Sequence, residues 1–245
     1  NRGTGAALNF LSAGNDLEIV SLADVFEDKV WDCHSKLQKQ KVEVPKKNCF
    51  WGFDSYKKLL EVDLDVVILA TPPHFRPEHL DAAVQAKKDV FMEKPAAVDP
   101  VGARKIIATS KKAESMGLTI ITGTQRRHQR DYLETYRQVA SGAIGEITSA
   151  KAWWLQSHVW FRTREEGWSD MEYMIRNWNN FCWLCGDHIL DTHVHNIDIV
   201  NWFMGKHPES AIGFGGRARR LTGDQYDFFS IDFDFGKGIF SHSMS

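Results

Sequence analysis

Short apolar runs rich in valine and isoleucine alternate with helical patterns through the first half of the chain. The runs are LEIVSLA (17–23), DVVILA (65–70), DVFME (89–93) and LTIITG (118–123). The helical patterns are GAALNFLSAG (5–14), RPEHLDAAVQAKK (76–88) and PVGARKIIATSKKAESMG (100–117). Strands that helices cover on both faces of a parallel sheet have this near-continuous apolar character. The alternation therefore predicts an α/β domain with a Rossmann-like, doubly wound parallel sheet.

The second half has a different pattern, with longer strand-like segments between polar turns. These segments are EITSAKAWWLQ (146–156), SAIGFGGRARR (210–220), YDFFSIDFDF (226–235) and GIFSHSMS (238–245). The FGKG turn predicts that the last two form a hairpin, and helical stretches are expected at 131–141 and 187–204. We expect an α+β domain with a large, open, mostly antiparallel sheet. The predicted domains are residues 1–124 and 125–245.

Composition limits the classes of partner. Hydrophobic residues make up 43% of the chain and charged residues 25%, which is ordinary for a globular protein with a real core. A net charge of -2 supplies no basic field for nucleic acid, and the apolar runs are too short to span a bilayer. The four cysteines are irregularly spaced, which does not indicate a disulfide framework.

The chain opens with NRGTG directly ahead of a helical pattern and closes within an apparent strand. We therefore expect a piece of a longer protein that lacks its first strand and the last part of its sheet. Compartment stays open between the cytoplasm and export, because the true N-terminus is not in view.

Half of a dinucleotide fingerprint stands at the start of the chain. Gly3 occupies the place of the third glycine of G-x-G-x-x-G, just ahead of the first helix, and Asp24 ends the first predicted strand. The glycines of this motif let the backbone approach a pyrophosphate at a helix N-terminus, and the acid accepts from ribose hydroxyls. A carboxylate there repels a 2′-phosphate, so NAD is favoured over NADP. The alternative is a glycine-containing loop and a surface acid.

Two motifs follow the buried runs at the edge where such folds bind ligands. ATPPHFRPEH (70–79) comes after one run, and EKP places Glu93 and Lys94 after the next. A lysine that a bound ring partly desolvates can hydrogen-bond a substrate hydroxyl and shift its proton affinity. The alternative for Lys94 is a solvated surface lysine.

The segment DTHVHNIDIVNWF (191–203) concentrates acid–base groups. On an α-helix Asp191 and His195 share one face, which suits a proton relay to a substrate hydroxyl, and Asp198 is placed to orient the imidazole. A metal site is the rival, built from His188, His193 and His195 or from Cys182 with Cys185. On a helix, however, His193 and His195 point about 200° apart, and a lone C-x-x-C is weak support for zinc. We expect no metal; a merely structural polar helix is the other alternative.

The combined motifs resemble the Gfo/Idh/MocA family, the glucose–fructose oxidoreductase and inositol dehydrogenase relatives. The matching pieces, in family order, are NRGTG with Asp24, ATPPHFRPEH, EKPAAVDP, GTQRRH, GAIGEI and CGDHILDTHVHNIDIVNW. The resemblance covers nearly the whole chain, and EKP followed by D-x-x-x-H-x-x-D is its most specific part. It implies a Rossmann domain followed by an open antiparallel sheet, and a homo-oligomer formed through the sheet domain.

The resemblance also implies roles for single residues. Lys94 matches the lysine that contacts substrate hydroxyl and nicotinamide, Asp191 the substrate-binding acid, and His195 the proton-transferring histidine. The positions expected to line the nucleotide are Asn1, Arg2, Gly3, Asp24, Thr71, Pro72, His79, Glu93, Lys94 and Gln125. The chain departs from the family pattern at two places. CGD replaces a glycine-rich run, and His193 stands at a position where the family often has glycine.

Further substrate contacts are expected from bulky polar and aromatic groups. Besides Asp191, the candidates are His193, Arg127, Trp160 and Trp178. A flat indole complements the C–H face of a pyranose, although most tryptophans of this stretch are expected in core or interface. Arg126 and Arg127 could contact substrate or, as the alternative, form surface ion pairs.

The predicted function is NAD(P)-dependent transfer of a hydride between nicotinamide and a secondary hydroxyl of a sugar, cyclitol or glycoside. An NAD-dependent glycosidase or lyase that acts by transient oxidation and elimination is the first alternative. A catalytically silent NAD(P)-binding regulator is the second.

Overall fold

The computed structural model describes residues 2–157 and 159–245. The chain divides into two compact units, one over residues up to 71 together with 75–123, the other over 72–74 together with 124–245. Each unit has its own sheets and helices, and each is described separately below.

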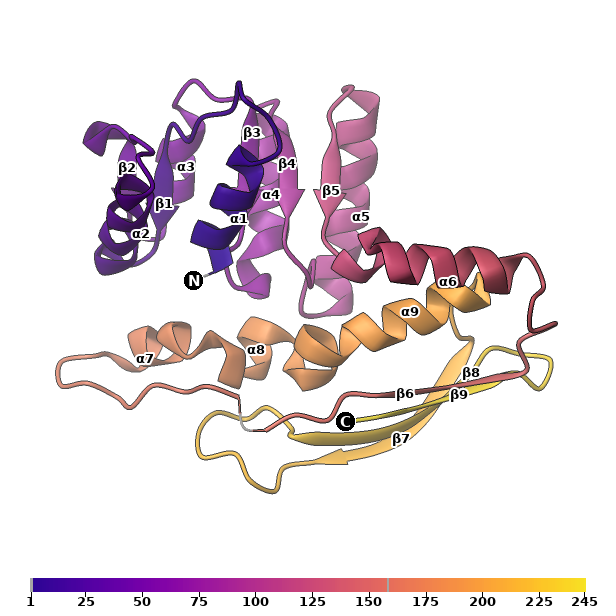
Figure 1. Cartoon of the computed structure of the whole chain (residues 1–245). Coiled ribbons are helices and arrows are strands. Elements are labelled where there is room, and N and C mark those ends of the chain that lie inside the picture. Colours follow the sequence, from indigo (N-terminus) through magenta and orange to yellow (C-terminus); the bar gives the residue numbers. More distant parts are fainter. Residues whose placement is uncertain (1, 158) are drawn as a thin grey trace. The chain divides into compact units, whose positions relative to one another are not determined.

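The first unit contains two parallel sheets (Figure 1). Strand β1 (Leu22–Asp24) pairs with β2 (Cys49–Trp51), and β3 (Val66–Leu69), β4 (Asp89–Met92) and β5 (Ile120–Thr122) pair in that order. No strand of the described residues hydrogen-bonds both β1 and β3. The parallel pairing confirms the Rossmann-like expectation, since parallel strands require the helical crossovers that the sequence alternation predicts.

Helices connect these strands. They are α1 (Arg2–Leu11), α2 (Glu27–Lys39), α3 (Ser55–Leu60), α4 (Arg76–Gln85) and α5 (Pro100–Ser115). Pro77 stands in the first turn of α4, where a missing N–H is tolerated. Asp99 caps α5, because its Oδ1 accepts a hydrogen bond of 2.6 Å from the Gly102 amide.

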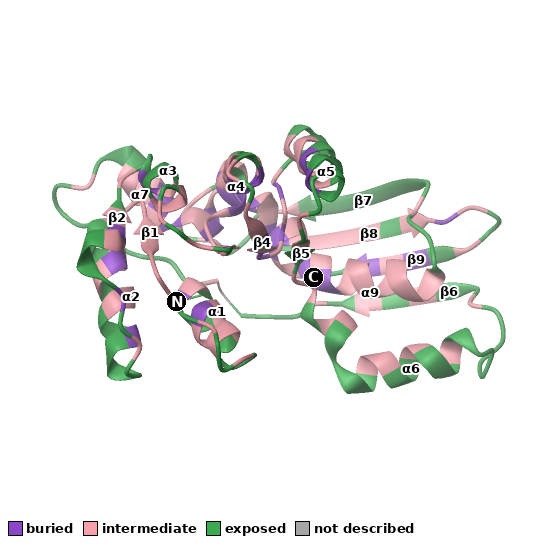
Figure 2. Cartoon of the chain, turned by 90° about the horizontal axis from the view of Figure 1, so that it is seen from above, coloured by how far each residue is buried: buried purple, intermediate pink, exposed green. Residues whose placement is uncertain are grey.

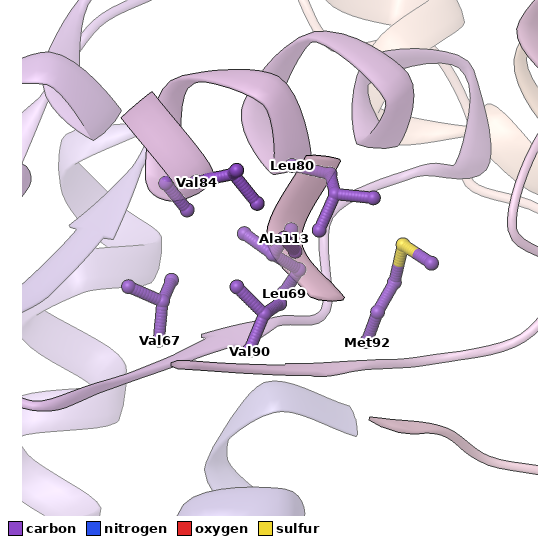
Figure 3. Packing of buried hydrophobic residues seen from close by; sticks show 8 residues of the cluster. Val67, Leu69, Leu80, Val84, Val90, Met92 and Ala113 are labelled. Atoms are coloured by element: carbon purple, nitrogen blue, oxygen red, sulfur yellow. The ribbon is translucent and has the colours of Figure 1, made fainter. Parts of the chain in front are cut away.

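The main core of this unit lies between β3, β4, α4 and α5. Figure 3 shows Leu80 and Val84 of α4 directed toward Val67 and Leu69 of β3. The remaining buried members are Ala83, Val90, Met92 and Ala113. Burial of each large aliphatic side chain contributes about 2 kcal/mol, which fixes the strand ends that carry the polar motifs.

The second unit is built on a four-stranded mixed sheet with the order β6-β9-β8-β7. Its strands are β6 (Ser149–Trp153), β7 (Ser210–Gly216), β8 (Phe228–Asp234) and β9 (Phe240–Met244). β6 runs parallel to β9, and the other two pairings are antiparallel. The predicted hairpin is confirmed for β8 and β9, whose turn contains Gly236, Lys237 and Gly238 at positive φ.

The helices of this unit are α6 (Arg130–Ala140), α7 (Asp170–Arg176), α8 (Cys182–Cys185) and α9 (Val194–Met204). Helix α9 packs against β6, and α6 packs on α9. The edge strand β7 is exposed along almost its whole length (Figure 2). Tyr136 of α6 stacks on Trp202 of α9, with ring centroids 4.6 Å apart. Ile212 and Phe214 of β7 are 74% and 80% exposed, so the edge strand presents apolar side chains to solvent.

The expected helix over 187–204 is confirmed, but it is not α-helical throughout. A π-helical turn (Ile189–His193) precedes α9, so Asp191 and His193 lie in π-helical backbone. Such turns add a residue to the helical repeat and are frequent at functional sites. Among the described residues, no helix combines the length and hydropathy needed to cross a bilayer.

Candidate active site

Asp24 lies at the carboxyl end of β1, where the sequence predicts the ribose contact. Its Oδ1 accepts a hydrogen bond of 3.0 Å from the Phe26 amide, which fixes the side chain in the turn after the strand. Burial raises the pKa of this carboxyl above its usual 3.8, and the Phe26 amide opposes the shift. A fixed, partly desolvated acceptor is the group that a ribose diol needs.

An ion pair joins two of the predicted cofactor positions. Arg2 at the start of α1 places Nε 2.7 Å from Oε1 of Glu93, which follows β4. Glu93 is buried, whereas the Arg2 side chain is mostly exposed. At Gly3 an added Cβ would lie 3.5 Å from the Ala70 Cβ, an ordinary contact, so the first turn of α1 packs closely over the end of β3.

A buried arginine that sequence reasoning missed connects the two motifs. Arg76 is 3% exposed, and its guanidinium donates to the carbonyl oxygens of Thr71, Glu93 and Pro95 at 2.8, 2.7 and 2.5 Å. It thus holds the turn after β3 against the turn after β4. The sequence signal was present in ATPPHFRPEH, but an arginine ordinarily indicates a solvated charge.

Lys94 follows Glu93 in the turn that Arg76 holds, and the Lys94–Pro95 peptide is cis. The side chain is partly buried rather than fully solvated. This placement at the carboxyl end of β4 agrees with the sequence expectation, while the catalytic role of Lys94 stays a prediction.

His79 lies in an aromatic environment on α4. Its ring packs on Tyr56 at 4.3 Å and on Phe75 at 6.0 Å, and Nδ1 lies 3.3 Å from the Thr71 hydroxyl oxygen. Burial lowers the pKa of His79 to about 4, so the ring is neutral at physiological pH. A neutral ring beside a hydroxyl is suited to polar contacts with a nucleotide.

The other predicted nucleotide positions are less informative. Pro72 is half-buried after β3, and Gln125 is exposed at the start of the 3₁₀ turn Gln125–His128. Both belong to the second unit. Asn1 lies outside the described residues.

The acid–base segment is buried within the second unit. Asp191 and His195 are each 7% exposed, and His193 is 1% exposed. His193 Nε2 hydrogen-bonds the hydroxyl of Ser243 on β9, so its ring faces the sheet. That surrounding gives no support to the substrate contact predicted for His193.

Trp154, the residue after β6, packs against His195. Their rings stack with centroids 5.8 Å apart and an angle of 26°. The Arg126 guanidinium lies 5.3 Å from the Trp154 ring and also hydrogen-bonds Asn196, the neighbour of His195. Asn196 in turn donates to the Trp153 carbonyl at 2.6 Å, which ties the start of α9 to β6.

Arg127 forms a bidentate ion pair with Asp198. Its Nε and Nη2 lie 2.8 to 3.0 Å from the two carboxylate oxygens, and this pairing raises the pKa of Arg127. Among the described residues, Asp198 makes side-chain hydrogen bonds to Arg127 alone, so the expectation that Asp198 orients His195 is wrong. The ion-pair alternative for Arg127 is the one that the structure shows.

The tryptophans expected at a sugar pocket lie against each other. Trp160 and Trp178 meet edge to face with centroids 6.5 Å apart, and Trp160 is 47% exposed. Their contact with substrate stays a prediction.

The two thiols of the C-x-x-C motif form hydrogen bonds within the protein. Cys182 Sγ donates to Asp187, and Gln225 donates to Cys185 Sγ. Burial raises the pKa of Cys185 to about 12 and that of Cys182 still further. No three histidine, cysteine or acidic side chains of the described residues are grouped to hold a metal ion.

The first unit fits a dinucleotide at the carboxyl ends of its strands. The fixed Asp24 carboxylate, the first turn of α1 and the Thr71–His79 pair supply an acceptor, backbone donors and a neutral polar contact there. Parallel sheets place ligands at this edge.

Family comparisons agree with this assignment. Residues 4–122 match the oxidoreductase family with an NAD-binding Rossmann fold, and residues 132–244 match the GFO/IDH/MocA C-terminal domain. The chain belongs to the Gfo/Idh/MocA oxidoreductase family. The predicted family and NAD as its cofactor are thereby confirmed.

The matches to individual relatives span only part of each relative's length. The chain is 27% identical over 179 residues to 2,7-anhydro-N-acetylneuraminate hydratase of Escherichia coli K12, covering 71% of this chain and 44% of the relative. It is 25% identical over 191 residues to scyllo-inositol 2-dehydrogenase (NAD(+)) of Bacillus subtilis 168, covering 76% of this chain and 50% of the relative. The chain thus spans about half the length of these curated relatives.

A solved structure shares the fold. The crystal structure of myo-inositol 2-dehydrogenase from Lactobacillus plantarum matches with a TM-score of 0.74 at 18% identity, over 98% of this chain and 65% of that one.

Proposed function

We propose that the protein is an NAD-dependent dehydrogenase of a sugar, cyclitol or glycoside, which oxidises a secondary hydroxyl. The observation that carries the proposal is the burial of an acid and a histidine, Asp191 and His195, on one segment of a chain whose other half belongs to an NAD-binding fold. The similarity to scyllo-inositol 2-dehydrogenase supports a polyol or sugar as substrate.

Each candidate residue has a separate task. Lys94 donates a hydrogen bond to the oxygen of the reacting hydroxyl and stabilises negative charge on it. His195 accepts the hydroxyl proton, and Asp191 binds the substrate and stabilises the resulting imidazolium. NAD, when bound, would supply the hydride acceptor. Burial of the acid–base pair excludes water from the proton transfer.

Trp154 limits the orientation of the His195 ring. Because the indole stacks on the imidazole, ring rotation would break the contact. An imidazolium against an indole face is also favoured by cation–π attraction, so the stack supports the protonated state that forms during oxidation.

Transient oxidation with elimination is the second candidate. The hydratase relative favours it, since a hydration involves no net redox change. A protein of this kind would hold NAD tightly and regenerate it within each cycle. A catalytically silent regulator remains the third hypothesis and predicts nucleotide binding without turnover.

The test uses the full-length protein with a panel of polyols, sugars and glycosides, and follows NADH formation. We expect NADH with at least one secondary alcohol, and a loss of kcat of about 10²- to 10⁴-fold in Lys94→Ala and His195→Asn. His207→Asn is the matched control, because His207 is exposed and hydrogen-bonds only its neighbour's carbonyl among the described residues.

The candidates separate by their products. Accumulation of NADH and a ketone identifies the dehydrogenase. Substrate consumption without NADH, with exchange of solvent deuterium into the product, identifies the eliminating enzyme. NAD binding with no turnover on any substrate identifies the regulator, and then Lys94→Ala would change only binding.

A further inference from the structure

A pocket of about 360 Å³ lies wholly within the second unit. It opens beyond the end of β6, beside the loop that joins β7 to β8. The lining residues that matter below are Trp154, Phe161, His188, Arg220, Asp227 and Phe228. None of the acid–base residues lines it, so the candidate active site does not account for the pocket.

His188 brings an unsatisfied polar group to this pocket. The residue is 3% exposed, and among the described residues its buried Nδ1 has no hydrogen-bond partner. Its ring stacks on Phe229 at 6.3 Å and an angle of 14°. Burial lowers the pKa of His188 to about 4, with Arg220 and His193 adding to the shift. A buried imidazole nitrogen without a partner costs free energy, and the ring that carries it forms part of the pocket lining.

Arg220 brings a half-buried cation to the same pocket. Its Nε donates to the Tyr226 carbonyl at 2.9 Å, and this is the only side-chain hydrogen bond that its guanidinium makes in the described part of the chain. The two terminal amino groups therefore keep their donors for a ligand. A guanidinium fixed through Nε presents a planar fork that matches a carboxylate.

Nearby acids do not satisfy this fork. Asp227 accepts hydrogen bonds from the backbone amides of Ala218, Arg219 and Arg220 at 2.9, 2.6 and 3.1 Å, so its oxygens serve the loop. Asp187 likewise accepts from the amides of His188 and Tyr226. The exposed Arg219 and Arg217 are the further cations nearby. The two carboxylates disfavour a doubly charged phosphate more than a singly charged carboxylate.

Aromatic and aliphatic side chains form the apolar part of the pocket wall. Its aromatic members are Trp154, Phe161 and Phe228, and aromatic rings pack well against the C–H face of a sugar ring. Trp154 also stacks on His195, so one indole contacts both the pocket and the candidate catalytic histidine.

We propose that this pocket is a binding site for a carboxylate-bearing sugar residue, such as a hexuronic acid. Arg220 binds the carboxylate through its terminal amino groups, His188 hydrogen-bonds a hydroxyl, and Trp154 packs against the ring. Binding does not depend on the proposed function; the further statement that this sugar belongs to the substrate oxidised at His195 rests on it.

The test compares two matched ligands, methyl β-D-glucuronide and methyl β-D-glucoside, by calorimetric titration of the NAD-loaded full-length protein. We expect the glucuronide to bind about tenfold more tightly or better, because a charge-assisted, bidentate contact is gained. Arg220→Gln should bring the two affinities to within about twofold, and Arg220→Lys should retain part of the preference. Arg137→Gln removes the same charge from an exposed ion pair on α6 and should leave the preference intact.

Three results would overturn the proposal: equal affinities in the unaltered protein, a preference that survives Arg220→Gln, or tighter binding of the methyl glucoside 6-phosphate than of the glucuronide. NAD binding by each variant checks that it is folded. Glucuronide binding through Arg220 without any turnover would contradict the proposed function alone. Turnover of neutral sugars without a binding preference for the glucuronide would contradict the pocket assignment alone.

Discussion

Arg76 is the residue whose burial has the clearest consequence for the nucleotide-binding edge. Its guanidinium binds three carbonyl oxygens from two turns, and an apolar replacement leaves buried acceptors unsatisfied. We expect Arg76→Met to lower the free energy of unfolding by about 2 to 4 kcal/mol and to weaken NAD binding. Urea unfolding and an NADH fluorescence titration measure the two effects. Arg104→Met on the exposed side of α5 is the control, and equal behaviour of the two variants would contradict the role of Arg76.

His188 gives the protein a pH-dependent contribution to stability. Its pKa is about 4 in the folded state against 6.5 in the unfolded chain, so the unfolded state binds the proton first as the pH falls. The contribution is complete above pH 6.5 and is lost between 6.5 and 4, amounting to roughly 3 kcal/mol. His188→Gln should therefore lose less stability than the unaltered protein over that interval. Parallel pH dependences of unfolding in the two proteins would disprove this account.

The functional side chains divide into those that the sequence predicted and those that it did not. Glu93 and Lys94 lie after β4 as expected, because a short apolar run followed by polar residues marks the end of a parallel strand. Arg76 was not assigned, and for Arg127 an ion pair was only the alternative, without Asp198 as its partner. Burial and pairing of charged groups depend on tertiary contacts that no local pattern encodes.

At the scale of single elements, α5 depends on its N-terminal cap. Asp99 accepts from the Gly102 amide, satisfying one of the first backbone donors of the helix. We expect Asp99→Ala to reduce the free energy of unfolding by about 1 kcal/mol and Asp99→Ser to reduce it less. Thermal unfolding of the two variants measures this difference, and an Asp99→Ala variant as stable as the unaltered protein would show that the cap is dispensable.

Strongly patterned elements were predicted well. β3, β4, α4 and α5 lie within the expected ranges because their apolar periodicity decides between strand and helix. Helix α2 and strand β2 were not predicted at all. The π-helical turn was also missed, because its extra residue leaves no signature in the local sequence pattern.

At the scale of the whole molecule, the exposed apolar strand β7 is relevant to assembly. Ile212 and Phe214 lie on an edge strand, and the family resemblance implies pairing of such sheets between subunits. We expect the full-length protein to be a homo-oligomer, and Ile212→Lys with Phe214→Lys to shift it toward the monomer in analytical ultracentrifugation. Lys151→Glu, a polar change on β6, is the control; a monomeric unaltered protein would refute the expectation.

The central claim is that this chain belongs to an enzyme that uses NAD. The most direct measurement is gentle denaturation of the natively purified full-length protein, followed by mass spectrometry of any released nucleotide and an NADH titration of the emptied protein. The account predicts NAD, with NADH binding that weakens in Asp24→Ala because the ribose acceptor is lost. Release of NADP would contradict the role of Asp24. Absence of nucleotide together with no NADH binding would contradict the account as a whole.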